Sequence, residues 1–497
     1  METHGGFGMV NATPKKRATA VVPAALPKFS TPVRLSEMLE EGLRFEAGAY
    51  NIEARHAVEQ MRAAGLALVP LYGENGLCRE AHNAFRFVRV WVSKEYGYPF
   101  LSSADIISMK PNIEYYLSEK LTKNLDHLTI KKWDVLISCS GTIGNVGLAS
   151  GSFAGAALSQ DAIRLRARDP ETAGYVTAFL RSKYGRLQIV QATYGSVIKH
   201  IEPLHLQRII IPELNDVRPA IGSQVVKAYE LRDEANNLLD KADSTLHSLL
   251  TLPPLSDVRV EKEGPVIVHQ RASKLSFRFD SSFHDPIAKA AEKILKKCGI
   301  EIRTLGDRSV TGEIRPITKF RKRVYVPNGG LLLLSSKQLM QIDPVDVKHL
   351  AKGVHTKDLP EIALRKNMVT MSRSGTIGKV QIIPAYMEGW AGSEHATRII
   401  AAGGMNPGYI YAWLSSDYGQ KLAKRHSYGS VILEIDKEML ESISIPFPHA
   451  DVRNQIGDLV LRANELRDQA WRIERDAIQD LESLIAGGAT RRPPRPV

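Results

Sequence analysis

Two glycine-rich segments with hydroxyl side chains are the first places in the chain to look for chemistry. Residues 138–146 read SCSGTIGNV, and residues 372–380 read SRSGTIGKV. A loop that holds nucleotide phosphates needs four residues between its first glycine and a Gly-Lys-Ser/Thr triplet. In the second segment only two residues separate the glycines and Val380 occupies the hydroxyl position, whereas in the first segment Asn145 replaces the lysine. We therefore interpret both segments as tight turns between strands.

Other sequence patterns that carry catalysis are absent. The chain has no His-Glu-x-x-His zinc motif, no Gly-x-Ser-x-Gly elbow, and no Asn/Asp-Pro-Pro-Tyr/Phe tetrapeptide of the amino-methyltransferases. Its cysteines, Cys78, Cys139 and Cys298, are far apart and form no Cys-x-x-Cys pair, which favours a reducing cytoplasm. We predict a protein that is not an enzyme and has no catalytic, cofactor-binding or metal-binding residues of its own.

The charge balance points to a polyanionic partner. The chain has 66 Lys and Arg against 54 Asp and Glu, a formal net charge of +12. Such an excess puts nucleic acid first among candidate partners. No apolar run approaches the roughly 18 residues that span a bilayer, so no membrane association is expected.

The chain contains one long repeat, at an offset of 234 residues, as from Gly141 to Gly375. The same offset relates further pairs of segments: Arg44-Phe45 and Arg278-Phe279, Tyr194–Ile198 and Tyr428–Ile432 (both YGSVI), and Ile211-Pro212 and Ile445-Pro446. A constant offset over roughly 170 residues indicates duplication of a whole globular domain.

Each copy ends in a segment with an apolar seven-residue rhythm. The first positions of the heptads are Ile221, Ala228, Ala235, Ala242 and Leu249, then Ile456, Ala463, Ala470, Ala477 and Leu484. Three positions further on stand Gln224, Leu231, Leu238 and Thr245, then Leu459, Leu466, Ile473 and Asp480. We expect two helices of about 30 residues, roughly 45 Å long, that pack antiparallel as a coiled coil because alanine lets their axes approach.

The two globular domains read as α+β. Opening helices are expected at 51–64 and 286–298, and single short helices at 175–184 and 409–418. Strand-like runs occur at 85–92, 135–138, 324–326, 331–334, 369–372 and 379–383. The fold prediction is two tandem mixed α/β domains, each followed by a long helix, with the antiparallel helices relating the domains by a pseudo-two-fold axis.

The two copies diverge in central inserts that carry much of the charge. Residues 312–368 hold eleven Lys or Arg against five Asp or Glu, and residues 78–134 hold nine against seven. A shared scaffold with different basic inserts suits two readers of different DNA half-sites. The candidate DNA-binding residues are Arg86, Arg89, Lys110, Lys120, Lys123, Lys131 and Lys132 in the first copy, and Arg315, Lys319, Arg321, Lys322, Arg323, Lys337, Lys348, Lys352, Lys357, Arg365 and Lys366 in the second. Further candidates for base-edge contacts are Asn112, Tyr115, Tyr116, Gln338 and Gln341.

After about residue 30, this chain resembles the specificity subunits of type I restriction-modification systems. The resemblance rests on the tandem domains, the SGTIG segments, the YGSVI segments, and the Ile-Pro pairs before the long helices. It departs from the family just before each helix, where a Pro-Pro and a Glu-Gln pair are common but this chain reads PELNDVR and PFPHADVR. The resemblance divides the chain into a disordered basic tail (1–30), a target recognition domain (31–215), a spacer helix (216–252), a second recognition domain (253–449), a second spacer helix (450–486) and a basic tail (487–497).

The resemblance implies a sequence-specific DNA-binding subunit that reads a bipartite, asymmetric site in double-stranded DNA. It implies two methyltransferase subunits that dock on this chain and methylate adenine with S-adenosylmethionine, and motor-nuclease subunits in complexes that also cleave DNA. The cofactor is expected in the partner, and none in this chain. The alternatives are a self-sufficient DNA-binding regulator and a divergent metal-dependent nuclease.

Overall fold

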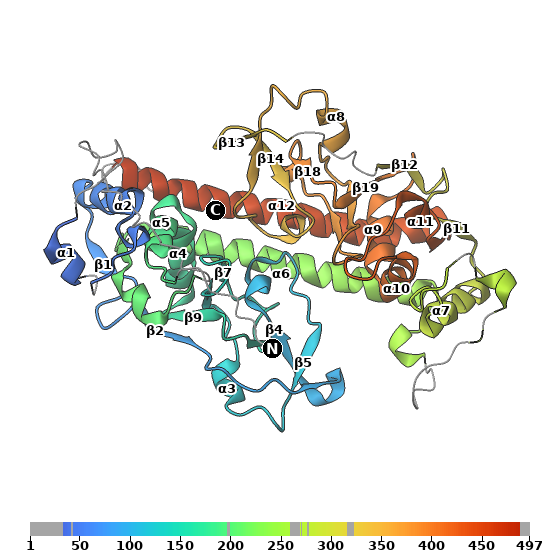
Figure 1. The fold of residues 1–497 in the computed structure, drawn as a ribbon, viewed down its shortest axis with the longest axis horizontal. Helices are drawn as coiled ribbons and strands as arrows, with labels where there is room; N and C mark the ends of the chain where they lie inside the picture. Colours follow the sequence, from blue (N-terminus) through green and yellow to red (C-terminus); the bar gives the residue numbers. More distant parts are fainter. Residues whose placement is uncertain are drawn as a thin grey trace, which may run out of the picture.

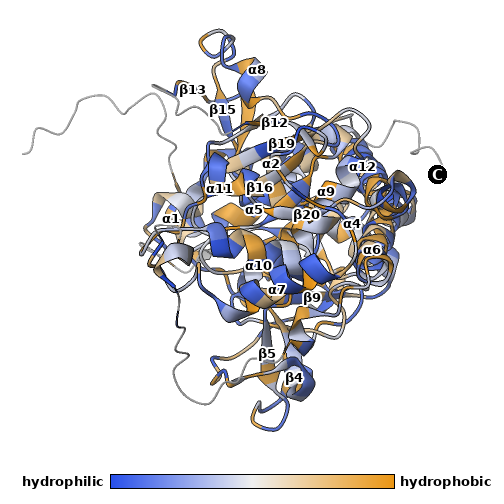
Figure 2. Ribbon diagram, turned by 90° about the vertical axis from the view of Figure 1, so that its right-hand side faces the viewer, coloured by the Kyte–Doolittle hydropathy of each residue, from blue (hydrophilic) through white to orange (hydrophobic). Residues whose placement is uncertain are grey.

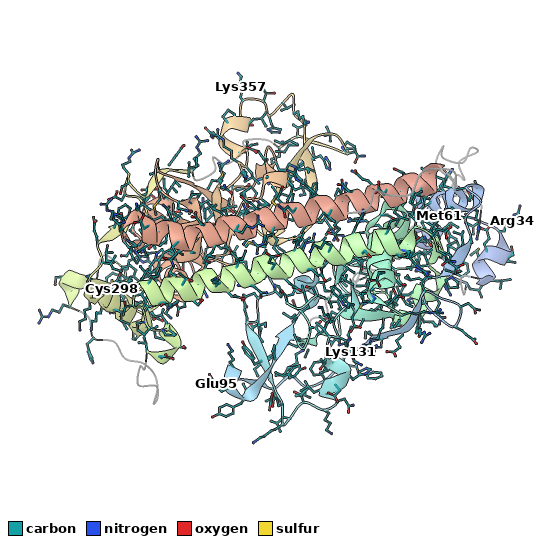
Figure 3. The ribbon with its side chains drawn as sticks, turned by 180° about the vertical axis from the view of Figure 1, so that it is seen from behind. Arg34, Met61, Glu95, Lys131, Cys298 and Lys357 are labelled. Carbon is teal, nitrogen blue, oxygen red and sulfur yellow. The ribbon has the colours of Figure 1, made fainter. Side chains whose placement is uncertain are left out.

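Two long antiparallel helices form the spine of the computed structural model, which describes residues 33–40, 43–195, 199–258, 269, 271–275, 278–315 and 323–487. The spine helices are α6 (Arg218–Leu249) and α12 (Ala450–Gly487), and they run in opposite directions along the length of the molecule (Figure 1). One face of the molecule shows both helices along their whole length (Figure 3). The two globular heads lie on the other side of the spine. Among the described helices, none is long and apolar enough to cross a bilayer.

The first head contains three β-sheets with strand orders β2-β9-β6-β7, β3-β5-β4-β8 and β1-β10. Its strands are β1 (Leu68–Pro70), β2 (Cys78–Asn83), β3 (Trp91–Val92), β4 (Gly97–Leu101), β5 (Tyr115–Ser118), β6 (Val135–Ser138), β7 (Val146–Leu148), β8 (Ala157–Leu158), β9 (Ala162–Ala167) and β10 (Ile210–Pro212). Its α-helices are α1 (Leu35–Glu40), α2 (Ile52–Ala63), α3 (Leu125–Leu128), α4 (Pro170–Arg181) and α5 (Lys183–Gln191). Short 3-10 turns include η3 (Ser103–Ile107).

The second head repeats this topology strand for strand, with orders β12-β19-β16-β17, β13-β15-β14-β18 and β11-β20. Its strands are β11 (Ile302–Thr304), β12 (Thr311–Arg315), β13 (Tyr325–Val326), β14 (Leu331–Leu334), β15 (Lys348–Leu350), β16 (Val369–Ser372), β17 (Val380–Ile382), β18 (Ala391–Gly392), β19 (Ala396–Ala401) and β20 (Ser444–Pro446). Its α-helices are α7 (Pro286–Lys297), α8 (Leu359–Ile362), α9 (Pro407–Ser415), α10 (Asp417–His426) and α11 (Lys437–Glu441), and η7 (Gln338–Met340) is a 3-10 turn. This agreement confirms the predicted α+β duplication.

Two local predictions were wrong. The expected late helices at 175–184 and 409–418 are each two helices, because Ser182 and Ser416 interrupt them and cap the second member through their side chains. The expected strand at 85–92 is a strand only at Trp91–Val92, where it pairs with β5, and the strand β2 just before it was not expected. Residues 85–90 are not part of a strand, although their alternating pattern resembles one, and the Val90 carbonyl accepts from the Ser118 amide at the end of β5 (2.8 Å).

Helix α6 packs against α12 through the alanines that the heptads predicted. Ala235 and Ala470 are completely buried, as are Ala228 and Ala463. Three positions after these alanines, Leu231 and Leu466 are buried as the heptads predicted, whereas Leu238 and Ile473 are half-buried. The residues four positions after the alanines are all buried: Arg232, Leu239, Arg467 and Glu474. The buried stripe is wider than a coiled-coil seam because α4 and α9 of the heads pack on the same two helices.

Glycine pairs bring the heads against the spine. A β-carbon on Gly174 of α4 would overlap the carbonyl oxygen of Gly222 of α6, and one on Gly408 of α9 would overlap that of Gly457 of α12. Only glycine allows two helix backbones to approach so closely at both places. The two head-to-spine contacts therefore share one geometry.

The heads also contact each other across the pseudo-two-fold axis. The Met109 amide donates to the Met340 carbonyl (2.9 Å), and the Ile342 amide donates to the Ile107 carbonyl (2.7 Å). These residues flank Ser108 and Gln341, which form an isolated antiparallel bridge. Since 107–109 and 340–342 occupy corresponding places in the two copies, the same segment pairs with itself at the centre of the molecule.

A buried ionic network reinforces this centre. The carboxylate of Glu474 on α12 accepts hydrogen bonds from Arg232 of α6 and from Arg181 of α4. Arg181 also forms an ion pair with Asp343 of the second head (2.9 Å). One arginine thus joins both heads and the spine, and removal of one partner of such a buried pair typically costs about 3–5 kcal/mol.

Replacement of Ala235 or Ala470 by phenylalanine should separate the spine helices by overpacking. We expect the free energy of unfolding to fall by about 1–3 kcal/mol for each variant, measured by urea denaturation. Asn237→Phe provides the control, because Asn237 is exposed on the same helix. Equal stability of all three variants would contradict close packing at the alanines.

The end of α6 is joined to the second head by a pH-sensitive ion pair. His247 Nε2 lies 3.2 Å from Asp417 Oδ1 at the start of α10. The hydrogen bond to Asp417, opposed by burial, raises the pKa of His247 from 6.5 to about 9. The contribution to stability is therefore complete below pH 6.5 and is lost as the pH rises through 9.

The difference in free energy of unfolding between the wild type and His247→Gln should accordingly decrease by about 1–3 kcal/mol between pH 6 and pH 10. Denaturation at several pH values measures this difference. His56→Gln on α2, where the histidine is exposed, should show no such dependence. A constant difference for His247→Gln would exclude the ion pair as its source.

Candidate nucleic-acid interface

Each head extends a distal sheet away from the spine. The sheet β3-β5-β4-β8 of the first head and the sheet β13-β15-β14-β18 of the second project on opposite sides of the molecule (Figure 2). Three of the four strands of each sheet lie within the divergent basic inserts, whereas β8 and β18 come from later in each copy. The structure therefore places the variable, charged part of each copy at an outer position on a shared scaffold.

Most of the predicted cations of the first head are exposed on this lobe. Arg86 and Arg89 precede β3, Lys120 and Lys123 follow β5, and Lys131 and Lys132 precede β6. Lys110 differs, because its ammonium group forms an ion pair with Asp240 of α6. Lys110 therefore links the lobe to the spine, and the other six cations face solvent.

The predicted cations of the second head divide in a similar way. Six are exposed: Lys337, Lys348, Lys352, Lys357, Arg365 and Lys366. Lys357 lies at the tip of the projecting lobe (Figure 3). Arg315 pairs with Glu313 (2.5 Å) and donates to the carbonyl of Pro360, and Arg323 pairs with Glu394, so both are engaged within the chain. Lys319, Arg321 and Lys322 lie outside the described residues.

Two of the predicted cation pairs are equivalent between the heads. Lys131-Lys132 and Arg365-Lys366 occupy the same turn, immediately before β6 and β16. The residue after each pair has a left-handed backbone, with φ of 72° at Trp133 and 62° at Asn367. The 234-residue offset already relates these pairs in sequence, but the sequence analysis treated them as separate candidates.

The first lobe carries an aromatic surface that the sequence analysis missed. The Trp91 ring lies 5.0 Å from that of Tyr115 and 5.2 Å from that of Phe100. The guanidinium of Arg89 stands 5.2 Å from the Phe100 ring centre, and Phe85 is 83% exposed. The alternation of aromatic residues with arginine in residues 85–92 was the available signal. Aromatic faces beside arginine are suited to stacking and phosphate contact.

Most of the five residues predicted to contact base edges are less available for such contacts than expected. The Asn112 side chain donates to Glu114 (2.7 Å), and the Gln338 side chain donates to the Val345 carbonyl (2.9 Å) and accepts from Ser335. Gln341 is buried at the contact between the heads. Of the five candidates only Tyr115 is exposed without a hydrogen bond to a described side chain, while Tyr116 is half-buried.

An arginine is buried at the same position of each head. Arg164 of β9 and Arg398 of β19 have almost no exposed surface, and burial lowers the pKa of each to about 10. Both guanidinium groups therefore stay charged at neutral pH. Burial, followed by the charge of Arg164, lowers the pKa of His82 to about 4, so His82 is neutral. Within the described ranges, no three His, Cys, Asp or Glu side chains gather as a metal-ligand set.

Residues 347–461 match the sequence model of the family described as type I restriction modification DNA specificity domain. The match runs from β15 of the second distal lobe to the first third of α12. The match to residues 347–461 confirms the resemblance that the repeated motifs indicated. A search of curated proteins finds no match.

Solved structures of similar proteins include two type I specificity subunits. The S subunit of M. genitalium is 13% identical, with 84% of this chain and 98% of that chain covered and a TM-score of 0.32. The HsdS subunit of Thermoanaerobacter tengcongensis is 16% identical, with 85% and 97% covered and a TM-score of 0.26.

The turn shared by both heads provides a test of the interface. Replacement of Lys131 and Lys132 by alanine should weaken DNA binding by about tenfold, equally for all sequences, and should reduce the slope of log affinity against log salt by about two. Fluorescence anisotropy at several salt concentrations measures both quantities. Lys296→Ala with Lys297→Ala on α7 removes the same charge from exposed positions of a helix outside the inserts. An equal loss in that control would show a general charge effect and no local contact.

Proposed function

We propose that this chain is the DNA-reading specificity subunit of a type I restriction-modification complex and has no catalytic centre of its own. The observation that carries this proposal is the duplication. The head that contains most of the family-matched residues 347–461 occurs in a second copy with the same sheet topology, and each copy is followed by its own spine helix around one pseudo-two-fold axis. A protein with two similar heads at a fixed separation can read two separated DNA segments at once.

The target is a bipartite, asymmetric site in double-stranded DNA. The heads share sheet topology, glycine contacts with the spine and a cation pair in the turn before β6 or β16, whereas the other exposed side chains of their lobes differ. The first lobe combines cations with an aromatic surface, and the second carries Lys337, Lys348, Lys352 and Lys357. Because different side chains present different contacts to base edges, each lobe reads a different half-site. The spine and the central contact hold the halves at one spacing.

The partners are two adenine methyltransferase subunits, which bring S-adenosylmethionine, and motor-nuclease subunits in complexes that cleave DNA. Support for two methyltransferase copies comes from the repeated scaffold, because two equivalent surfaces bind two copies of one partner. This role requires access to chromosomal DNA and places the chain in the cytoplasm. In this arrangement the chain supplies recognition and the partners supply chemistry.

Exchange of one lobe should change one half of the target. Residues 312–368 should be replaced by the corresponding segment of another specificity domain, except that Met340–Asp343 are retained because they hold the contact between the heads. Only one half of the methylated sequence should change, as read by sequencing of methylated adenines in cells that contain the methyltransferase. The reciprocal exchange of 78–134, with Ile107–Met109 retained, should change the other half. A change in both halves after a single exchange would contradict modular reading.

Purification from the native host identifies the complex directly. An adenine methyltransferase recovered at about two copies per chain would support the specificity-subunit role. Recovery of the chain alone, with tight binding to one DNA sequence, would favour a self-sufficient regulator. Metal-dependent cleavage by the purified chain would favour a nuclease.

A further inference from the structure

A cleft of about 510 Å³ lies between the two heads, beside the central contact. Its volume falls within the roughly 300–1,000 Å³ of small-molecule sites. The first head contributes residues of η3 and of the SGTIG turn, and the second head contributes residues of β13, β14, β15 and the turn before β19. A ligand in this cleft would touch both heads.

Three buried side chains present unpaired oxygen atoms among the residues that line this cleft. Asn145 Oδ1, Gln341 Oε1 and Ser393 Oγ have no hydrogen-bond partner, and the three side chains are only 6–8% exposed. In the first head the residue equivalent to Ser393 is Ser159, whose hydroxyl accepts from the Asp161 amide (3.1 Å). A buried oxygen without a donor calls for a hydrogen-bond partner, and a ligand in the cleft can supply it to the three oxygens at once.

Two lysines give the cleft a positive side. Lys337 and Lys348 line it and have no acidic partner among the described residues, and the Lys348 ammonium stands 5.3 Å from the Tyr325 ring centre. The acidic groups of the cleft are already engaged, since Glu394 pairs with Arg323, and Asp346 lies 3.3 Å from Arg186. The corresponding places in the first head hold Ala104 and Tyr115. The positive side therefore belongs to this cleft and is not repeated in the other copy.

We propose that this cleft binds one nucleotide unit, with its phosphate at Lys337 and Lys348 and the amino group of its base donating to the amide oxygens of Asn145 and Gln341, beside the Ser393 hydroxyl. The lysines need an anion, whereas the unpaired oxygens need N–H donors, and a nucleotide carries both. Adenine, guanine and cytosine each have an exocyclic amino group and thymine has none. The unit is either a free nucleotide or one nucleotide of a bound DNA, and the cleft does not require that the heads read sequence.

Calorimetric titration of the full chain with dAMP, dGMP, dCMP, dTMP and inorganic phosphate tests the site. We expect one saturable site that favours the amino-bearing nucleotides over dTMP. Lys337→Met with Lys348→Met should weaken binding by about tenfold.

Gln341→Met should reduce the preference for amino-bearing bases. Its thermal midpoint should not fall, because an unpaired buried amide is replaced by an apolar side chain of similar shape. The control is Lys296→Met with Lys297→Met on α7, which lies at one end of the molecule (Figure 1).

The same variants distinguish the two sources. One possible result is that no mononucleotide binds, but that the double lysine variant and Gln341→Met each weaken binding to a short mixed-sequence duplex more than the α7 control does. In that case the nucleotide belongs to DNA. Inorganic phosphate that binds as tightly as the nucleotides would overturn the proposal. The proposal would also be overturned if no mononucleotide bound and the cleft variants bound the duplex as tightly as the α7 control does. The Lys131 and Lys132 variants test the outer interface separately, so failure of one proposal leaves the other standing.

Discussion

The close approach of α6 and α12 is the interaction on which the rest of the structure depends. Alanine at the contact positions removes side-chain bulk, so the helix axes can come near each other over several turns. An antiparallel pair of similar helices has an approximate two-fold axis perpendicular to it. Everything attached to equivalent points of the two helices is then related by the same axis, which is why the distal lobes of the two heads project on opposite sides of the molecule (Figure 2).

The heads add two constraints to this spine. The glycine contacts of α4 with α6 and of α9 with α12 dock each head at a helix backbone and leave little room for rotation. The self-pairing of 107–109 with 340–342 then joins the heads directly. A rigid separation of two recognition lobes suits a reader of two half-sites, since flexible lobes would lose more entropy when both bind.

The shared and divergent parts of the copies have different physical roles. Sheet order, strand registers, buried arginines and glycine contacts are the same in both heads, and all of them belong to packing. The lobes differ in cations, in aromatic surface and in the residues beside the central cleft. A duplication that keeps its packing and changes its surface can recognise two different partners with one fold, and the cleft shows that the difference extends inward to the interface between heads.

The sequence by itself determined the duplication, the spine and the α+β heads. The repeat offset is a direct property of the chain, and the helix rhythm is visible because neighbours on a helix surface lie only three or four residues apart. The sequence also indicated Lys131, Lys132, Arg365 and Lys366 as exposed cations. These pairs could be found from the sequence because the turn that holds each pair is formed by residues adjacent in the chain. Local patterns gave a wrong prediction where a serine cap divides a helix, as at Ser182 and Ser416. They were also wrong where tertiary pairing decides, as at residues 85–89, which alternate like a strand but are not part of one.

Only the tertiary structure decided which side chains remain available. Lys110 forms an ion pair with Asp240, 130 residues away in the chain, and Arg323 forms one with Glu394, 71 residues away. Both cations were predicted from the sequence to contact DNA, but each is already paired within the chain. The unpaired oxygens of Asn145 and Gln341 come together from different heads. Such contacts depend on the docking of one domain against another, and no periodicity or motif within a single segment carries that information.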